Sequence, residues 1–257
     1  TIQSVVMGFG LHMSSGLWNS MHNKHHATPQ KIKHDIDLDT TPFVAFYNTA
    51  IEKNSERRQM EGGVRAPHAR PPGKWVRLWM KFQAYTFLPV VDGVLVMLFW
   101  IYYLHPRKAL RDKNWLECTA LLLSHTLRPW LFYYFGDGAY SFLEAYGLFL
   151  LVIWGTGVYD LGHFSLSHTF TPVVAENAHP TWLHYSINHT VDIDPHNTLV
   201  SWIMGYLNCQ VEHHLFPSMP QYKQPEISPV IAAFCKKWGL TYQCMSYFDA
   251  WRAMFAN

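Results

Sequence analysis

The sequence predicts an all-α fold, an integral membrane helical bundle with a cytosolic cap that is rich in histidine. Three observations point to this fold. Three segments of about 20 residues are apolar, the length that a helix needs to cross a hydrocarbon core of about 30 Å. Hydrophobic residues make up 49% of the chain and charged residues only 15%. The 257 residues include 16 histidines, and two short clusters hold several of them.

The apolar segments cover residues 85–104, 115–135 and 142–161. Trp and Tyr gather near their ends, as in the aromatic belts of membrane helices. If the two histidine clusters form one site, they lie on one side of the membrane, so only two of the three segments cross it. Hydropathy favours 85–104 and 142–161, because 115–135 contains more polar residues. The charge of the connecting loops favours 115–135 and 142–161 instead, and the choice stays open.

Basic residues are concentrated between the first histidine cluster and the first apolar segment. Residues 52–81 carry eight Lys or Arg against three Glu. Within this stretch, residues 52–74 are also rich in Gly and Pro, which favours a loop. A basic loop beside apolar segments is typical of the cytosolic side of a membrane.

Several classes of protein find no support in the sequence. The net charge of +2 gives no basic surface for nucleic acid. The nucleotide-binding and hydrolase motifs G-x-G-x-x-G and G-x-S-x-G are absent, as is the zinc-peptidase motif H-E-x-x-H. The four cysteines have no C-x-x-C spacing, and we expect them to be free thiols.

The two histidine clusters predict a metal site. His22, His25 and His26 have the spacing H-x-x-H-H, which places three side chains within about 100° of one helix face. The second cluster, Q-V-E-H-H, repeats this spacing with Gln210, His213 and His214. Imidazole nitrogen is a good ligand for iron, copper, zinc or nickel. The Gln oxygen is a weaker neutral ligand, or it acts through a water or a hydrogen bond to a ligand.

A further ligand is expected just after the last apolar segment, in G-H-F-S-L-S-H. His163 and His168 lie about 140° apart around a helix, so only one of them is expected at the site. We prefer His163, which is nearer to the segment end. Glu212 falls at a different helix angle from its histidine neighbours, which predicts solvent contact or a supporting role. Asp35 lies in a polar stretch that predicts a solvated loop or a support for a ligand imidazole.

These motifs resemble the membrane fatty-acid desaturase superfamily. W-N-S-M-H-N-K-H-H-A-T-P-Q is similar to its second histidine box, and Q-V-E-H-H-L-F-P-S-M-P is similar to its third. A Gln that opens the third box is typical of front-end desaturases, which insert a double bond between an existing one and the carboxyl end. H-D-I-D-L-D-T-T-P and W-I-M-G-Y-L-N-C-Q-V-E-H-H also resemble Δ4, Δ5 and Δ6 polyunsaturated fatty-acid desaturases.

The resemblance implies an O2-dependent oxidoreductase with a non-haem di-iron centre in its cap. It implies a fatty-acyl substrate, carried by CoA or by a lipid, and electrons from NADH or NADPH through a reductase and cytochrome b5. It places the enzyme in the endoplasmic reticulum membrane with its histidine boxes facing the cytosol. The expected iron ligands are His22, His25, His26, His163, Gln210, His213 and His214.

The family's first histidine box and its fused cytochrome b5-like domain have no counterpart in residues 1–257. We therefore expect a partial catalytic domain, truncated at its N-terminus, and no activity from these residues alone. The alternative functions are a related histidine-box acyl hydroxylase, a sphingolipid desaturase, or a membrane metal-binding or transport protein without enzyme activity.

Overall fold

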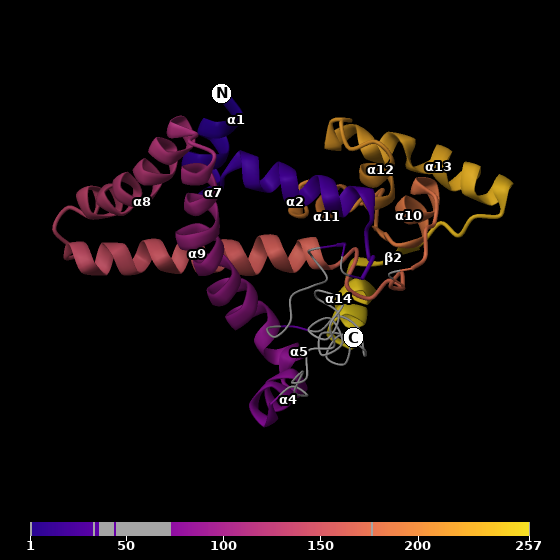
Figure 1. Cartoon of the computed structure of the whole chain (residues 1–257), viewed down its shortest axis with the longest axis horizontal. Coiled ribbons are helices and arrows are strands. Elements are labelled where there is room, and N and C mark those ends of the chain that lie inside the picture. The colour runs from indigo at the N-terminus through magenta and orange to yellow at the C-terminus, as the bar shows by residue number, and fades with distance from the viewer. Residues whose placement is uncertain (1, 33, 36–43, 45–72, 176, 257) are drawn as a thin grey trace, which may run out of the picture. The chain divides into compact units, whose positions relative to one another are not determined.

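The protein is predominantly helical in a computed structural model that describes residues 2–32, 34–35, 44, 73–175 and 177–256 (Figure 1). The described chain forms two compact units. The first comprises Thr1–Asn23 and Tyr85–Gly162, and the second comprises Lys24–Ala84 and His163–Asn257. The predicted loop 52–74 lies almost entirely outside the described residues.

The first unit is built from helices alone. They are α1 (Ile2–Val5), the π-helical η1 (Val6–Gly10), most of α2 (Ser15–Ala27), most of α5 (Gln83–Thr86), the π-helical η2 (Phe87–Val96), α6 (Met97–Phe99), the π-helical η3 (Trp100–Leu104), α7 (His105–Arg111), α8 (Trp115–Phe135) and most of α9 (Phe142–Ser165). Residues 136–141 join α8 and α9 into a helical hairpin (Figure 1). Gly138 has a φ of +78° in this connection, a conformation that glycine adopts without strain.

Two helices are long and apolar enough to cross a membrane, judged by length and composition among the described residues. One is the continuous helix Gln83–Arg111, and the other is α9. These correspond to the pair that hydropathy favours, while α8 is a helix of similar length that is more polar. The interface between η2, α6 and α9 is close, because a Cβ atom at Gly157 would lie 2.8 Å from the carbonyl oxygen of Asp92.

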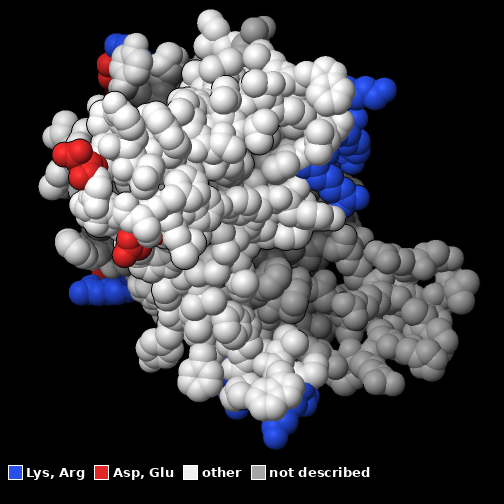
Figure 2. Space-filling model, turned by 90° about the vertical axis from the view of Figure 1, so that its left-hand side faces the viewer, with Lys and Arg blue, Asp and Glu red and all other residues white. Residues whose placement is uncertain are grey.

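The surface carries many exposed apolar side chains. On the face that Figure 2 presents, charged side chains lie mostly toward the margins and uncharged side chains cover the centre. In the first unit, Leu122 is 63% exposed, Leu143 79% and Leu151 58%. Exposed apolar surface on this scale is typical of contact with lipid or with another protein.

The second unit contains the end of α2 and the more polar segments that precede and follow the apolar helices. Its other elements are α4 (Lys74–Lys81), α10 (Trp182–Asn188), β1 (Asp192–Ile193), α11 (Thr198–Ile203), α12 (Gln210–Leu215), the 3-10 helix η4 (Gln221–Lys223), α13 (Gln224–Trp238), β2 (Cys244–Met245) and α14 (Tyr247–Ala256). The two short strands pair in parallel, Asp192 opposite Cys244. Helix α12 packs against α10 and α13 around buried Ile187, Val211 and Cys235 (Figure 1).

Local signals explain where several helices begin and end. The side chains of Asn114, Thr181 and Asn197 accept hydrogen bonds from backbone N–H groups at the starts of α8, α10 and α11. Such caps satisfy donors that have no partner within the helix. Helix α13 ends at Trp238, and the next residue, Gly239, has a φ of +68° that closes the helix. All four cysteines are free, as the sequence predicts.

Candidate metal centre

The first histidine cluster lies on the last two turns of α2. His25 and His26 are buried and His22 is half-buried. The helix ends at Ala27, and the N–H of Thr28 donates to the carbonyl oxygen of Lys24, 3.1 Å away. The predicted helical spacing is therefore present. The three imidazoles nevertheless do not converge on one point, because His25 and His26 are about 100° apart around the helix.

The second cluster forms the short helix α12, whose six residues are all buried. A helix of this length is not stable by itself and depends on tertiary contacts. Asp192 supplies one of them, because its Oδ1 accepts a hydrogen bond from the N–H of Val211 at 2.9 Å. Gln210, the first of the three ligands predicted in this cluster, is the first residue of the helix and is 2% exposed.

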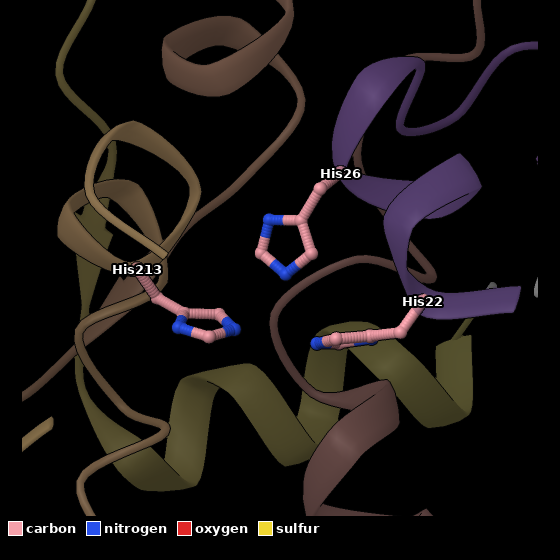
Figure 3. A group of neighbouring side chains, drawn as sticks. All are labelled: His22, His26 and His213. Carbon is pink, nitrogen blue, oxygen red and sulfur yellow. The ribbon is translucent and has the colours of Figure 1, made fainter. Parts of the chain in front are cut away.

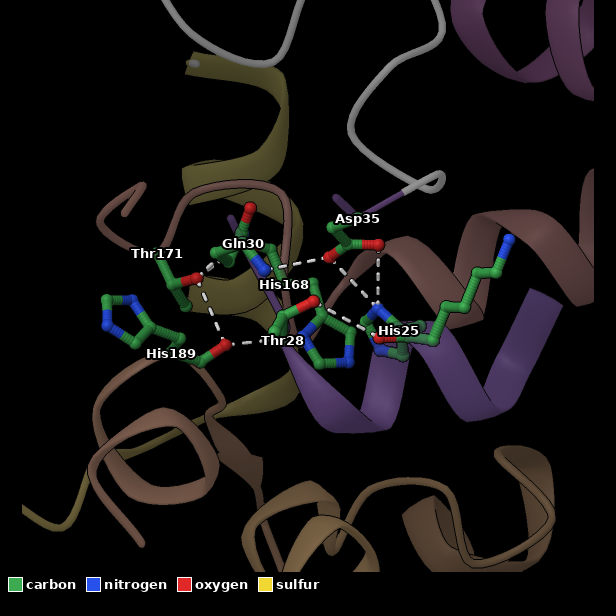
Figure 4. A network of polar contacts seen from close by, with 8 residues as sticks. His25, Thr28, Gln30, Asp35, His168, Thr171 and His189 are labelled. Atoms are coloured by element: carbon green, nitrogen blue, oxygen red, sulfur yellow. Dashed lines mark hydrogen bonds and ion pairs between the residues drawn. The ribbon is translucent and has the colours of Figure 1, made fainter. Parts of the chain in front are cut away.

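A third segment contributes His168, in the turn that follows α9. Its carbonyl oxygen accepts hydrogen bonds from the side chains of Gln30 and Thr171, the latter at 2.8 Å (Figure 4). Its ring Nδ1 lies 3.3 Å from the carbonyl oxygen of His189. That contact suits an N–H at Nδ1, which leaves the lone pair on Nε2.

The imidazoles form two groups, each with ligand nitrogens within 4.8 Å of one another. The first group is His25, His168 and His214, and all three are buried. The second is His26 and His213 with His22, which α2 carries one turn before His26 (Figure 3). Because each histidine pair in the sequence contributes one ring to each group, the two groups are adjacent. The ring centroids of His26 and His214, one from each group, are 4.3 Å apart.

Burial keeps these imidazoles in the form that binds a metal. It lowers the pKa of His168 to about 3 and that of His213 to about 4, and it holds the pKa of His214 well below its usual value. The rings are therefore neutral near pH 7, with a lone pair available. Among the described residues, neither ring nitrogen of His214 has a hydrogen-bond partner, and Nε2 of His168 has none. Buried polar atoms of this kind call for a ligand, and a metal ion fits them.

Asp35 supports the first group. Its carboxylate oxygens lie 3.0 and 3.1 Å from Nδ1 of His25 (Figure 4). One of them also accepts a hydrogen bond from the N–H of Gln30 at 2.7 Å. Asp35 is only 2% exposed, so the supporting role, and not the solvated loop, is what the structure places here. A carboxylate on Nδ1 fixes the ring tautomer and directs Nε2 to a metal.

Glu212 supports the second cluster from the opposite side of α12. It is fully buried, so the expected solvent contact is wrong. Its Oε1 lies 3.4 Å from the hydroxyl of Tyr242, which also donates to Asp192. Burial, with Asp192 close by, raises the pKa of Glu212 to about 9. Through these contacts, Glu212 and Asp192 connect α12 to β1 and to Tyr242, which lies just before β2.

The structure does not bring His163 into either group. Helix α9 continues to Ser165, and Nε2 of His163 lies 2.9 Å from the hydroxyl of Tyr247 in α14. The chain turns after this helix, and His168 lies with His25 and His214. His189 also lies in neither group, and its Nδ1 is 2.5 Å from the carbonyl oxygen of Pro172. His68 lies outside the described residues, and the remaining histidines lie in neither group: His12, His34, His105, His125, His179, His184 and His196.

Comparison with known proteins identifies relatives along almost the whole chain. A family model described as fatty acid desaturase matches residues 2–246. An acyl-lipid (8-3)-desaturase of Rebecca salina is 40% identical over 256 residues, covering 100% of this chain and 55% of the relative. A protein of the same name from Thraustochytrium sp is 37% identical over 250 residues, covering 97% and 52%. An sn-1 linoleoyl-lipid 6-desaturase of Arthrospira platensis is 26% identical over 255 residues, covering 95% and 64%.

This chain spans about half the length of the first two of these relatives. No solved structure matches it.

Proposed function

Since the chain belongs to the fatty acid desaturase family, we propose that it is the catalytic part of a front-end fatty-acyl desaturase. Its reaction is the insertion of a cis double bond into a polyunsaturated acyl chain. The observation that carries the proposal is the pair of adjacent imidazole groups contributed by α2, α12 and the turn after α9. Two neighbouring sites of neutral nitrogen ligands fit a di-iron centre.

The proposed ligands are six histidines. His25, His168 and His214 hold one ion, and His22, His26 and His213 hold the other. Gln210, buried one turn before His213 and His214, is proposed as a weak neutral ligand or as a ligand that acts through water. His168 replaces His163 in this proposal. Bound iron supplies the activation of O2, and neutral imidazoles hold it without adding charge.

The proposed net reaction removes one hydrogen from each of two adjacent methylenes. O2, two electrons and two protons are consumed with these hydrogens, and two waters form with the alkene. The protein's own part is to hold the ligands and exclude bulk water from them. Burial of His25, His168 and His214 serves that purpose, and Asp35 keeps Nδ1 of His25 protonated so that Nε2 binds.

The substrate class follows from the relatives and from Gln210. Two relatives are named acyl-lipid desaturases, which favours a lipid over CoA as the carrier of the acyl chain. The Gln that opens the second cluster supports front-end chemistry. The electron donors are proposed to be cytochrome b5 and its NAD(P)H reductase, and the location to be the endoplasmic reticulum membrane with the metal centre facing the cytosol.

The test is to express the complete protein in a host that is fed defined polyunsaturated acids, and to identify acyl products by mass spectrometry. We expect one new cis double bond on the carboxyl side of an existing one, and about two irons per purified chain. His214→Ala should abolish the product and lower the iron content. His184→Ala, an exposed histidine in neither group, is the matched control. A hydroxylated product, or zinc in place of iron, would refute the proposal.

A further inference from the structure

We infer that Gln30 is a positioning residue that sets two ligands of the first imidazole group, His25 and His168, relative to each other. The inference rests on the metal centre proposed above. Gln30 and both histidines belong to the second unit. Gln30 acts through the segments that hold the two rings, and its own side chain is not assigned as a ligand.

The backbone of Gln30 is connected to the support of His25. Its N–H donates to Oδ2 of Asp35 at 2.7 Å, and the same oxygen lies 3.0 Å from Nδ1 of His25. His25 lies in the last turn of α2, which ends at Ala27, shortly before Gln30. The carboxylate that orients the ring is therefore held by the chain that directly follows it.

The side chain of Gln30 is connected to the segment of His168, 138 residues further along the chain. Its amide N–H groups have two acceptors, the carbonyl oxygen of His168 and the hydroxyl oxygen of Thr171, the latter at 2.8 Å (Figure 4). A reversed amide would set Oε1 against the carbonyl oxygen of His168, and two acceptors do not bond to each other. The orientation of the amide is therefore fixed by its surroundings.

The carbonyl group of Gln30 adds a third connection between the same segments. It accepts a hydrogen bond from the N–H of Val174 at 2.8 Å, and the N–H of Ile32 donates to the carbonyl oxygen of Val174 at 3.1 Å. These bonds form a parallel bridge between Lys31 and Val174. Gln30 thus lies where the chain after α2 meets the chain after α9.

The conformation of Gln30 is unfavourable by itself. Its φ is +61°, in the left-handed region that residues other than glycine rarely adopt. The side chain is 1% exposed, and among the described residues its Oε1 has no hydrogen-bond partner. Backbone strain and unpaired buried polar atoms are concentrated at sites where function requires the geometry. They favour a role at the metal centre over a role in the fold alone.

The experiment compares the complete protein with its Gln30→Met variant, both prepared without metal in detergent micelles. Met keeps the length of the side chain but has no N–H donor, and the backbone bond to Asp35 remains. Co²⁺ is titrated in competition with a chelator, so that the dissociation constants of two bound ions are measured separately. His168→Ala and His22→Ala identify which constant belongs to the first group and which to the second.

We expect Gln30→Met to weaken binding of the ion in the first group by about tenfold, the lower end of the effect of losing a group that orients a ligand. The ion held by His22, His26 and His213 should keep its affinity. A residue that serves only the fold would not separate the two ions in this way.

The matched control is Gln243→Met. The side-chain N–H of Gln243 also donates to a backbone carbonyl oxygen, that of Asn188 at 3.0 Å, and Asn188 is not a ligand. This variant loses the same kind of hydrogen bond, and both Co²⁺ affinities should stay unchanged. Thermal unfolding of the metal-free proteins checks that each variant is folded.

Two results would overturn the inference. Unchanged affinity for both ions in Gln30→Met would mean that Gln30 positions neither ligand. Equal weakening of both ions, with a lower unfolding midpoint of the metal-free variant, would mean that Gln30 serves the fold alone. Failure of the proposed metal centre has a separate sign, because the unsubstituted protein would then bind no pair of Co²⁺ ions, and both proposals would fall.

Discussion

His163 and His168 are the two histidines between which spacing alone could not decide. They lie five residues apart, and both follow an apolar segment. In the structure α9 holds His163 against Tyr247, while the turn after Ser165 directs His168 to His25 and His214. The ring centroids of His25 and His168 are 4.6 Å apart. The two side chains therefore have different predicted consequences when removed.

His168→Ala should weaken iron binding at least about 10–100-fold and lose desaturation, because removing a metal ligand costs no less than removing the groups that orient one. His163→Ala should keep the iron and most of the activity. Metal content by mass spectrometry and product yield in the fed host measure both. The opposite ranking of these two variants would return His163 to the ligand set.

Asp35 is proposed to act through His25, because its carboxylate lies 3.0 Å from Nδ1 of that ring. Asp35→Ala should lower iron affinity about 10–100-fold, the usual effect of losing a carboxylate that orients a ligand imidazole. Asp35→Asn, which keeps one oxygen acceptor, should restore part of the affinity. Competition with an iron chelator measures it. Asp249→Ala on α14, where the side chain is 58% exposed, is the control and should bind iron normally. Unchanged affinity in Asp35→Ala would show that Asp35 serves only the local fold.

At the scale of elements, α9 offers a matched pair of glycines. A Cβ atom at Gly157 would meet Met97 and the carbonyl oxygen of Asp92, whereas a Cβ atom at Gly155 would meet no heavy atom within 4 Å. The close approach lets α9 pack against η2 and α6, and Met97 of α6 belongs to one buried cluster with Phe149 and Ile153 of α9.

Gly157→Ala should lower the free energy of unfolding by about 1–3 kcal/mol, because the packed helices must move apart. Gly155→Ala should be neutral, or should stabilise α9 by up to about 1 kcal/mol through helix propensity. Thermal unfolding in detergent micelles compares the two. Equal effects would contradict the close contact at Gly157.

At the scale of the whole molecule, the metal centre connects segments that are distant in the sequence. It brings together α2, α12 and the turn after α9. Within the described part of the chain, the ring nitrogens of His214 and Nε2 of His168 have no hydrogen-bond partner. A bound metal should therefore stabilise the folded chain.

Removing iron with a chelator should lower the free energy of unfolding by about 3 kcal/mol, compared with protein at a free iron concentration 100-fold above its dissociation constant. The shift appears as a lower midpoint of thermal unfolding. In His214→Ala the chelator should have a much smaller effect, because less metal is bound at the start. An equal shift in this variant would place the stabilising metal elsewhere.

The sequence was sufficient for features that depend on near neighbours. The spacing of His22, His25 and His26 on a helix is local, and so are the lengths of the apolar helices. The surroundings of Glu212 could not be predicted in this way. Its helix angle shows that it points away from His213, but not which residues it meets there. The contacts that bury it come from Asp192 and Tyr242, 20 and 30 residues away along the chain.

The sequence by itself determined that this chain carries two helical histidine clusters with metal-binding spacing beside membrane-length apolar segments, and it identified the family through them. Only the tertiary structure decided how the imidazoles are divided. His25 lies with His214 and His168, and His26 lies with His213, because the helix angle between His25 and His26 turns them toward different neighbours. It also placed His168, and not His163, beside His25 and His214, since that placement depends on the residue at which α9 ends and on the segments against which the following turn packs.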